Sequence, residues 1–335
     1  MPALWRKSGR SRVRTALQFL VIGIIASILL LAAVGAAYES LAEYRDRQVF
    51  SPHGQMIDVG GYRLHIDCSG EGSPTVVLDS GAGEPGREWA LVQPEIAKFT
   101  RVCSYDRAGY GWSDSGPLPR TSERSVSELH TLLTRAGIAP PYIIAGHSLG
   151  GMNMRLYAAR YPHEVAGVVL VDASHPDQEL KGFRPSLSPL AALDPVLLRL
   201  GVLRALFVLD GAAKVPRELR DELEYLALQD KTIATDLSEV RSFPQSAAQV
   251  RTAGNLGDKP LIVLTAEYSA QRRPELRQVW LDELQPDLVR LSSQGKQQMV
   301  NAGHFIPLQK PDAVVQAVRQ IWEHADSTRH VLVKN

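Results

Sequence analysis

The stretch YIIAGHSLG, residues 142–150, decides how this chain folds. A short apolar run at 142–145 leads directly into Gly-His-Ser-Leu-Gly, and a helical pattern follows at 152–161. A G-x-S-x-G sequence between a buried strand and a helix forms a turn so tight that side chains at the two glycine positions would clash. The pattern predicts that Ser148 ends a buried strand with its hydroxyl clear of the sheet, and that it is positioned as a nucleophile.

Further runs of strand length lie on both sides of this turn. They are residues 55–59 and 62–67, which flank Gly60-Gly61 as a hairpin, then 75–78, 101–105, 165–171, 261–264 and 297–300. Continuous apolar runs suit strands that are buried on both faces of a parallel sheet. Helical patterns at 122–136, 152–161 and 314–322 alternate with them. The alternation predicts an α/β fold with a mostly parallel, doubly covered sheet.

One long stretch interrupts the alternation. Residues 175–257 contain no convincing strand, and they hold Leu-rich helical segments at 195–209 and 217–228. We therefore expect a helical insertion, or cap, at 175–257. It divides the α/β core into a first part at 55–174 and a second part at 258–325, and 326–335 form a C-terminal tail.

The N-terminal part has the pattern of a membrane anchor. Residues 1–15 are basic and contain no acid, and residues 16–38 carry no charge. About 20 apolar residues span the hydrocarbon core of a bilayer. The basic flank predicts a single span with the N-terminus in the cytoplasm and everything after residue 38 on the other side, with 39–54 as a linker. A cleaved signal peptide, whose apolar region is typically 7–15 residues, and a buried core helix are the alternatives.

A serine nucleophile needs a general base, and we expect it late in the chain. His304 lies in the stretch NAGHFIPLQKP, after the expected last strand at 297–300 and before the helical pattern at 314–322. A loop in that position opens at the carboxyl edge of a parallel sheet, where ligands bind. The sequence therefore predicts His304 as the base, with His175 as the alternative.

An acid must orient the base, and two strand ends can supply it. Asp172 follows the run at 165–171, and Glu267 follows the run at 261–264. A carboxylate at either place can accept the Nδ1 proton of a histidine and fix its tautomer. We favour Asp172, which stands directly at its strand tip, and Glu267 and Asp177 stay open as alternatives.

A tetrahedral intermediate needs two backbone donors for its oxyanion. One is the amide that follows the nucleophile, which belongs to Leu149. The other is expected from the glycine-rich loop LDSGAG at 78–83, where Ala82 is the candidate donor.

Composition excludes several classes of function. The 335 residues carry a net charge of +1, so no overall field attracts nucleic acid. The two cysteines form no Cys/His cluster, so we expect no metal site. Nucleophilic chemistry on a serine also needs no organic cofactor.

These features together resemble the α/β-hydrolase family. The tight turn around Ser148 is similar to the nucleophile elbow of this family. The stretch YDRAGYGWSD at 105–114 is similar to the family's loop after the fourth strand, and the GHF of 303–305 is similar to its histidine loop. The resemblance covers about residues 55–325, with 175–257 as the variable cap. It implies an eight-stranded, mostly parallel sheet with helices on both faces.

Two departures from the family pattern bear on the site. The stretch DSGAG at 79–83 stands where many members have His-Gly, and the loop after 261–264 lacks the usual Gly-x-x-Asp acid. The second departure favours Asp172, and some lipases of this fold are similar in using that strand.

A serine nucleophile implies an acyl-enzyme, and therefore cleavage of a carboxylic ester or a related acyl bond. Acyl transfer, C–C bond hydrolysis, peptide hydrolysis and a catalytically inactive binding protein are the alternatives. The Leu-rich cap suggests a small substrate with an apolar acyl group. The sequence identifies neither that substrate nor an oligomeric state.

The resemblance also bears on the two cysteines. In this fold the second and fourth strands are neighbours. Cys68 stands at the end of the run at 62–67, which corresponds to the second strand, and Cys103 lies in the run at 101–105, which corresponds to the fourth. The expected topology places both in an oxidising compartment, where a disulfide persists. Two separate buried thiols fit the packing preference of free cysteine at least as well, so the pairing stays open.

Overall fold

The computed structural model describes residues 5–183, 193–206, 215–268 and 274–333. They form two compact units, which are considered separately. One unit contains the long helix α1 (Trp5–Val49) together with α5 (Asp194–Arg199) and α6 (Val202–Leu206). The other contains the sheet and the helices around it.

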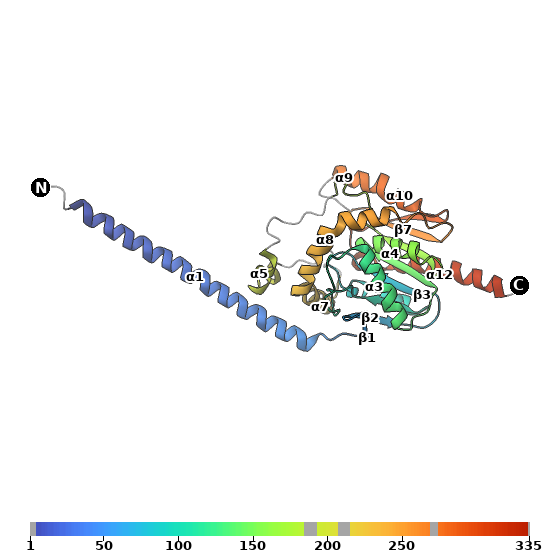
Figure 1. Ribbon diagram of the computed structural model, residues 1–335, viewed down its shortest axis with the longest axis horizontal. Coiled ribbons are helices and arrows are strands. Elements are labelled where there is room, and N and C mark those ends of the chain that lie inside the picture. The colour runs from blue at the N-terminus through green and yellow to red at the C-terminus, as the bar shows by residue number, and fades with distance from the viewer. Residues whose placement is uncertain (1–4, 184–192, 207–214, 269–273, 334–335) are drawn as a thin grey trace. The chain divides into compact units, whose positions relative to one another are not determined.

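The sheet has eight strands in the order β1-β2-β4-β3-β5-β6-β7-β8. Figure 1 labels β1, β2, β3 and β7 of this sheet. Only β1–β2 and β2–β4 pair antiparallel, and every other neighbouring pair is parallel. The predicted fold class is confirmed. The strands are β1 (Gln55–Asp58), β2 (Arg63–Ser69), β3 (Thr75–Asp79), β4 (Val102–Tyr105), β5 (Tyr142–His147), β6 (Val165–Val171), β7 (Leu261–Ala266) and β8 (Gly295–Val300).

Successive side chains of the central strands enter two different cores. Ile144 of β5 packs in one apolar cluster and Ile143 in another, because side chains alternate across a strand. Helices α3 (Ser122–Arg135), α4 (Leu149–Arg160) and α8 (Asp230–Arg251) contribute to the first cluster. The second cluster is closed by η1 (Gly86–Trp89), α2 (Gln93–Ile96), α11 (Ile306–Gln309) and α12 (Pro311–Val333). Both faces are therefore buried, which explains why the strands are continuous apolar runs.

The expected cap at 175–257 is divided in the structure. Helix α7 (Arg217–Ala227) corresponds to the helical segment predicted at 217–228, and α8 also lies inside the predicted insertion. The last turns of α8, however, pack in the first core cluster through Phe243, Ala247 and Val250. Residues 193–206 fall in the unit of α1 instead. After β7 the chain forms α9 (Pro274–Val279), a π-helical turn η4 (Trp280–Leu284) and α10 (Gln285–Val289) before β8.

Helix α1 is longer than the apolar run that predicts it. Its segment Val13–Val49 contains a window of mean hydropathy 2.8 with no buried residue, and it is long and apolar enough to be a candidate membrane span. The helix continues through 39–49, a stretch for which we expected a linker. The linker is therefore helical for most of its length.

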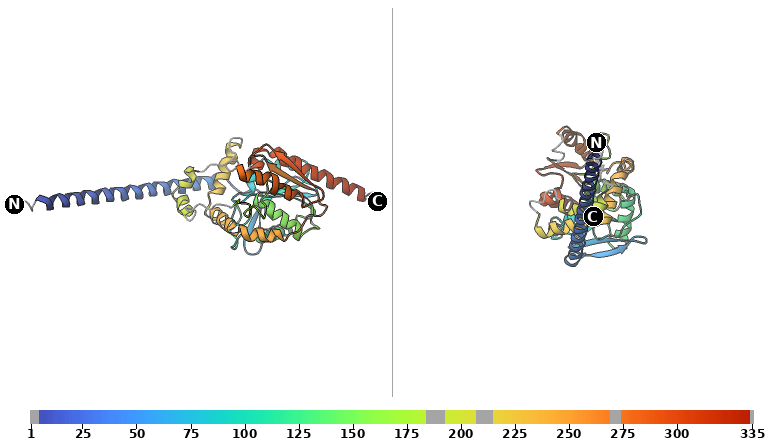
Figure 2. Two further views of the ribbon diagram at one scale, coloured as in Figure 1. Left: turned by 90° about the horizontal axis from the view of Figure 1, so that it is seen from above. Right: turned by 90° about the vertical axis from the view of Figure 1, so that its left-hand side faces the viewer.

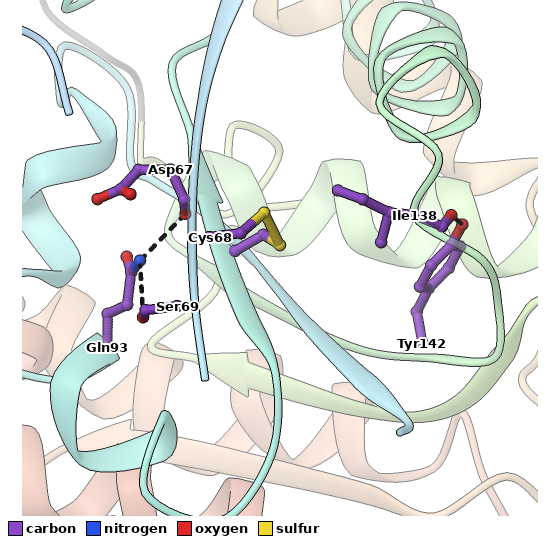
Figure 3. Close-up of a disulfide and its surroundings, with 7 residues drawn as sticks. Asp67, Cys68, Ser69, Gln93, Ile138 and Tyr142 are labelled. Atoms are coloured by element: carbon purple, nitrogen blue, oxygen red, sulfur yellow. Dashed lines mark hydrogen bonds between the residues drawn. A yellow bond between two sulfur atoms is a disulfide. The ribbon is translucent and has the colours of Figure 1, made fainter. Parts of the chain in front are cut away.

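The structure joins the two cysteines that the sequence left open. Cys68 of β2 and Cys103 of β4 are directly opposite each other in the antiparallel pair, and they form a disulfide (Figure 3). Beside it, the Gln93 side chain donates to the Asp67 carbonyl and to the Ser69 hydroxyl. The bond closes a loop of 35 residues. Restricting a loop of that length in the unfolded chain stabilises a fold by about 4 kcal/mol.

Candidate active site

The turn between β5 and α4 has room only for glycine at two positions. A Cβ on Gly146 would lie 2.4 Å from the Gly150 carbonyl carbon, and one on Gly150 would lie 2.4 Å from the Asp79 carbonyl oxygen. Both distances are shorter than any tolerated carbon contact. Between the two glycines, Ser148 adopts φ +50° and ψ −119°, a region that residues with side chains rarely occupy. Its strained backbone is thus enforced by the surrounding turn.

The tip of β6 holds this serine from both sides. The Ser148 N–H donates to the Val171 carbonyl at 3.1 Å, and the Ser148 carbonyl accepts from the Ser174 N–H at 2.9 Å. The next residue along the chain after Val171 is Asp172. The nucleophile candidate and the acid candidate are therefore fixed to the same strand end.

Ser148, His304 and Asp172 come together as a hydrogen-bonded series. His304 Nε2 lies 3.0 Å from Ser148 Oγ, and His304 Nδ1 lies 2.6 Å from Asp172 Oδ2. In the tautomer that this arrangement requires, Nδ1–H donates to the carboxylate and Nε2 accepts from the hydroxyl. The His304 side chain is 35% exposed whereas Asp172 is fully buried, so a substrate can reach only one end of the series.

Donors that the sequence did not indicate hold the Asp172 carboxylate in place. Its Oδ1 accepts from the Ala266 N–H at 3.1 Å and from Trp280 Nε1 at 2.9 Å. Asp172 itself lies at φ +40°, another left-handed conformation without glycine. Trp280 follows Asp172 by 108 residues and belongs to no local motif, so sequence patterns could not reveal it.

The alternative residues have other partners. Glu267 lies after β7, where its N–H donates to Val300 and its carbonyl accepts from Arg277. His175 is buried, its Nε2 donates to Asp287 at 3.0 Å, and burial lowers its pKa. Neither residue contacts Ser148 or His304 through any bond among the described parts of the chain.

Two backbone amides border the space in front of Ser148. Leu149 opens α4, so its N–H is one of the four that have no acceptor inside the helix. On the opposite side the loop after β3 approaches closely, because a Cβ on Gly81 would lie 3.5 Å from Ser148 Cβ. The next residue, Ala82, is exposed, and its N–H has no acceptor among the described residues. Both expected oxyanion donors are thus available for a ligand.

One buried guanidinium fixes this loop. Arg107 donates to Asp79 Oδ1 at 2.8 Å, to the Ser80 carbonyl at 2.7 Å and to the Gly81 carbonyl at 2.8 Å. It also donates to both carboxylate oxygens of Glu239 on α8, at 2.9 and 3.1 Å. Arg107 belongs to the stretch YDRAGYGWSD, which follows β4. This stretch therefore contributes to the site by holding the loop after β3.

A second buried group links the loop to the elbow and to the histidine. His147 forms an ion pair with Glu88, in which Nδ1 lies 2.5 Å from Oε1. The other Glu88 oxygen accepts from the Gly81 N–H at 3.0 Å, and His147 Nε2 donates to the His304 carbonyl at 2.9 Å. The residue inside a G-x-S-x-G pattern is expected to pack or to form hydrogen bonds rather than to act as a catalyst, and His147 has such contacts. Its acidic partner is 59 positions away and carries no local signal.

Electrostatics favour the charged form of His147. Burial lowers its pKa, but the Glu88 carboxylate outweighs burial, and the pKa of His147 is raised above its ordinary value. Burial, together with Glu88, raises the pKa of Glu84 on the same loop to about 8, so Glu84 is protonated at neutral pH.

Among the described residues, no three or more His, Cys, Asp or Glu side chains form a group that could hold an ion.

Comparison with known proteins identifies relatives that are similar in sequence over most of this chain. Residues 76–317 match the sequence model of the alpha/beta hydrolase family. The uncharacterized protein YqjL of Bacillus subtilis (strain 168) is 26% identical over 255 residues, which cover 76% of this chain and 85% of that protein. The uncharacterized protein YbdG of the same organism is 26% identical over 164 residues, 48% of this chain. The chain spans only 50% of the length of YbdG.

A solved structure supports the fold independently. The enol-lactonase from Burkholderia xenovorans LB400 superposes with a TM-score of 0.62 at 21% identity, over 80% of this chain and all of that one. At this identity the likeness concerns the fold alone.

The buried ion pair predicts a pH-dependent stability. Because the pKa of His147 is raised by folding, the pair stabilises the fold fully below the ordinary histidine pKa of about 6.5, and this stability is lost as the pH rises through the raised value. His147→Gln should therefore cost about 3 kcal/mol near pH 6 and progressively less at alkaline pH. Urea denaturation of both proteins between pH 6 and 9.5 measures this. The double variant His147→Gln/Glu88→Gln controls for titration of the orphaned carboxylate. A cost that does not change with pH would contradict a charged His147.

Proposed function

The chain belongs to the α/β-hydrolase family, and from that membership we propose that it is a serine hydrolase that cleaves a carboxylic ester or a related acyl bond. One observation carries the proposal. The Ser148 hydroxyl, the His304 imidazole and the Asp172 carboxylate form a continuous hydrogen-bonded series, with contacts of 3.0 and 2.6 Å. This is the arrangement that activates a serine for acyl transfer.

The geometry supports a two-stage reaction. His304 Nε2 takes the Ser148 proton while Oγ attacks the substrate carbonyl, and it then gives that proton to the departing alcohol. Water repeats the sequence on the acyl-enzyme and releases the acid and the free serine. Asp172 keeps Nδ1–H of His304 pointed inward and stabilises the imidazolium that forms transiently.

We propose that the backbone N–H groups of Leu149 and Ala82 donate hydrogen bonds to the oxyanion. Charge develops on the carbonyl oxygen in front of Ser148, where the N-terminus of α4 supplies a positive dipole end. Each preorganised donor of this kind contributes about 10²–10³-fold in rate. Arg107 and the His147–Glu88 pair support the donors by fixing the loop on which Ala82 lies.

Other reactions of an activated serine remain the second candidate. Acyl transfer, C–C bond hydrolysis and peptide hydrolysis would use the same residues, and a binding protein would need none of them. The complete hydrogen-bonded series favours catalysis over binding alone. The substrate we propose is a small compound with an apolar acyl group, and no nucleic acid, metal ion or organic cofactor takes part.

Removal of the nucleophile should abolish catalysis while leaving the fold intact. Ser148→Ala removes one hydroxyl, and we expect p-nitrophenyl ester hydrolysis to fall by at least about 10³-fold with an unchanged denaturation midpoint. A fluorophosphonate probe should label the wild-type protein and not the variant. Labelling of Ser148→Ala would mean that another residue is the nucleophile.

The choice of acid can be tested with a matched pair of variants. Asp172→Asn should lower kcat by about 10⁴-fold, because an amide favours the wrong tautomer of His304. Glu267→Gln makes the same chemical change at the neighbouring strand end and should leave kcat within about threefold, since its side chain has no role in the series. The opposite ranking of the two variants would assign the acid to Glu267.

We further propose that α1 anchors the protein in a membrane, with the N-terminus in the cytoplasm and the sheet-containing unit on the other side. The apolar segment of α1 and the basic residues before it support this orientation. The disulfide supports it independently, because such bonds persist outside the cytoplasm.

Reporter fusions test this orientation. A phosphatase that folds only in an oxidising compartment should be active when fused after Asn335, and inactive when fused after Arg14. Mass spectrometry of the membrane fraction should find residues 16–38 still attached, which separates an anchor from a cleaved signal peptide. Activity of the fusion after Arg14 alone would reverse the topology.

A further inference from the structure

Residues 193–206, which we call the foot segment, pack against α1 within one compact unit (Figures 1 and 2). Their closest approach depends on two glycines. A Cβ on Gly35 of α1 would lie 2.3 Å from the Leu200 carbonyl oxygen. Gly201, at φ +69°, lies so near Tyr38 that a Cβ would be 3.0 Å from its ring. The turn between α5 and α6 is thus seated directly on α1 at residues 35–38.

Ionic contacts fix the same segment at Glu39, next to Tyr38, and at Asp46, about two helical turns further along α1. Arg204 binds Glu39 through Nε and Nη2, both at 3.0 Å, and it binds Asp46 through Nη1 at 2.9 Å. The side chains of Arg204 and Glu39 are about nine-tenths buried in this contact. A bidentate, partly desolvated pair of this kind holds a defined geometry.

The place of contact lies where the apolar run of α1 ends. A helix rises 1.5 Å per residue, so about 20 residues of the run at 16–38 cross the hydrocarbon core. Gly35 and Tyr38 then stand at its far boundary. The foot segment touches α1 at that level and is therefore held at the surface of the membrane.

The foot segment exposes apolar side chains where a water-facing surface would carry polar ones. Leu193, Val196 and Leu206 are 48, 54 and 71% exposed. On α1, Tyr38 and the two residues one and two turns beyond it, Leu41 and Tyr44, are 53, 49 and 64% exposed. Tyrosines are enriched where a helix leaves the hydrocarbon region.

We propose that the foot segment lies in the interfacial layer of the same bilayer that α1 spans, with Leu193, Val196 and Leu206 in contact with lipid. The inference rests on the membrane anchor proposed above. Lipid is the occupant because the apolar surface of the foot segment adjoins the lipid-facing surface of α1. Short helices with an apolar face and a charged, anchored opposite side bind membrane interfaces in this way.

Depth-dependent quenching in the full-length protein tests the proposal. The only two cysteines, Cys68 and Cys103, are joined, so a single introduced cysteine carries an environment-sensitive dye selectively. The three sites are Leu206→Cys in the foot segment, Leu29→Cys within the apolar run and Val49→Cys at the end of α1, whose native side chains are 71, 64 and 71% exposed. The labelled proteins are reconstituted in phosphatidylcholine vesicles with and without lipids that bear a doxyl quencher.

We expect at least a twofold loss of fluorescence for Leu29→Cys and for Leu206→Cys. Val49→Cys, about 16 Å beyond Tyr38 along the helix, should lose less than a fifth. Quenching at Leu29→Cys without quenching at Leu206→Cys would overturn the proposal that the foot segment contacts lipid. The proposal that α1 is a membrane anchor would still stand. No quenching at Leu29→Cys would overturn the anchor itself. An unquenched Leu206→Cys dye whose signal changes with protein density would indicate a second copy as the occupant, and would equally overturn the proposal.

A charge reversal at Arg204 tests whether its contacts with Glu39 and Asp46 hold the foot segment on α1. Arg204→Glu places a third carboxylate beside Glu39 and Asp46, which should release the foot segment and cut the quenching at Leu206→Cys by at least half. Arg204→Lys keeps the charge and should retain most of the quenching. The signal from Leu29→Cys should not change in either background, which controls for insertion of α1. Full quenching of Leu206→Cys in the Arg204→Glu background would show that docking on α1 does not hold the segment at the membrane.

Discussion

The turn between β5 and α4 brings backbone segments so close together that no side chain fits at Gly146 or Gly150. The two glycines leave Ser148 a single conformation, at φ +50°, and the tip of β6 holds it there by hydrogen bonds to its N–H and its carbonyl. Since Asp172 follows directly on that tip, the steric constraint that shapes the turn also sets the distance between acid and nucleophile. Only His304 comes from a different part of the sheet, the loop after β8.

The loop opposite the serine has no such steric constraint, and buried charges fix it instead. Arg107 holds its carbonyl groups, and the Glu88 carboxylate holds the Gly81 N–H while it pairs with His147. Buried charges are costly unless an opposite charge lies beside them, so these paired residues favour one conformation of the loop. The stretch DSGAG thus reaches the required geometry without the His-Gly of many family members, because Gly81 lets the loop approach Ser148.

Much of this was predictable from local patterns. The elbow and the buried strands follow from spacing and hydrophobicity, and the late histidine follows from chain order. The sequence favoured Asp172 but left Glu267 open, since both residues follow neighbouring parallel strands and only the folded backbone directs one of them toward His304. The sequence could not show that the last turns of α8 pack in the sheet core, because an apolar helical face has the same period whatever it covers. Trp280 and Glu88 act across long sequence separations, where single-chain patterns carry no information.

The histidine sits on a different support from the other two residues of the series. It follows β8, the last strand of the sheet, whose residues are mostly half-exposed, whereas Ser148 and Asp172 follow the buried central strands β5 and β6. Edge elements open locally at a smaller free-energy cost than the core. We therefore expect this edge to open first on warming, which would separate His304 from the serine and the aspartate. Heat inactivation would then precede global melting and reverse on cooling, so that one strand rather than the whole domain would set the temperature limit of activity.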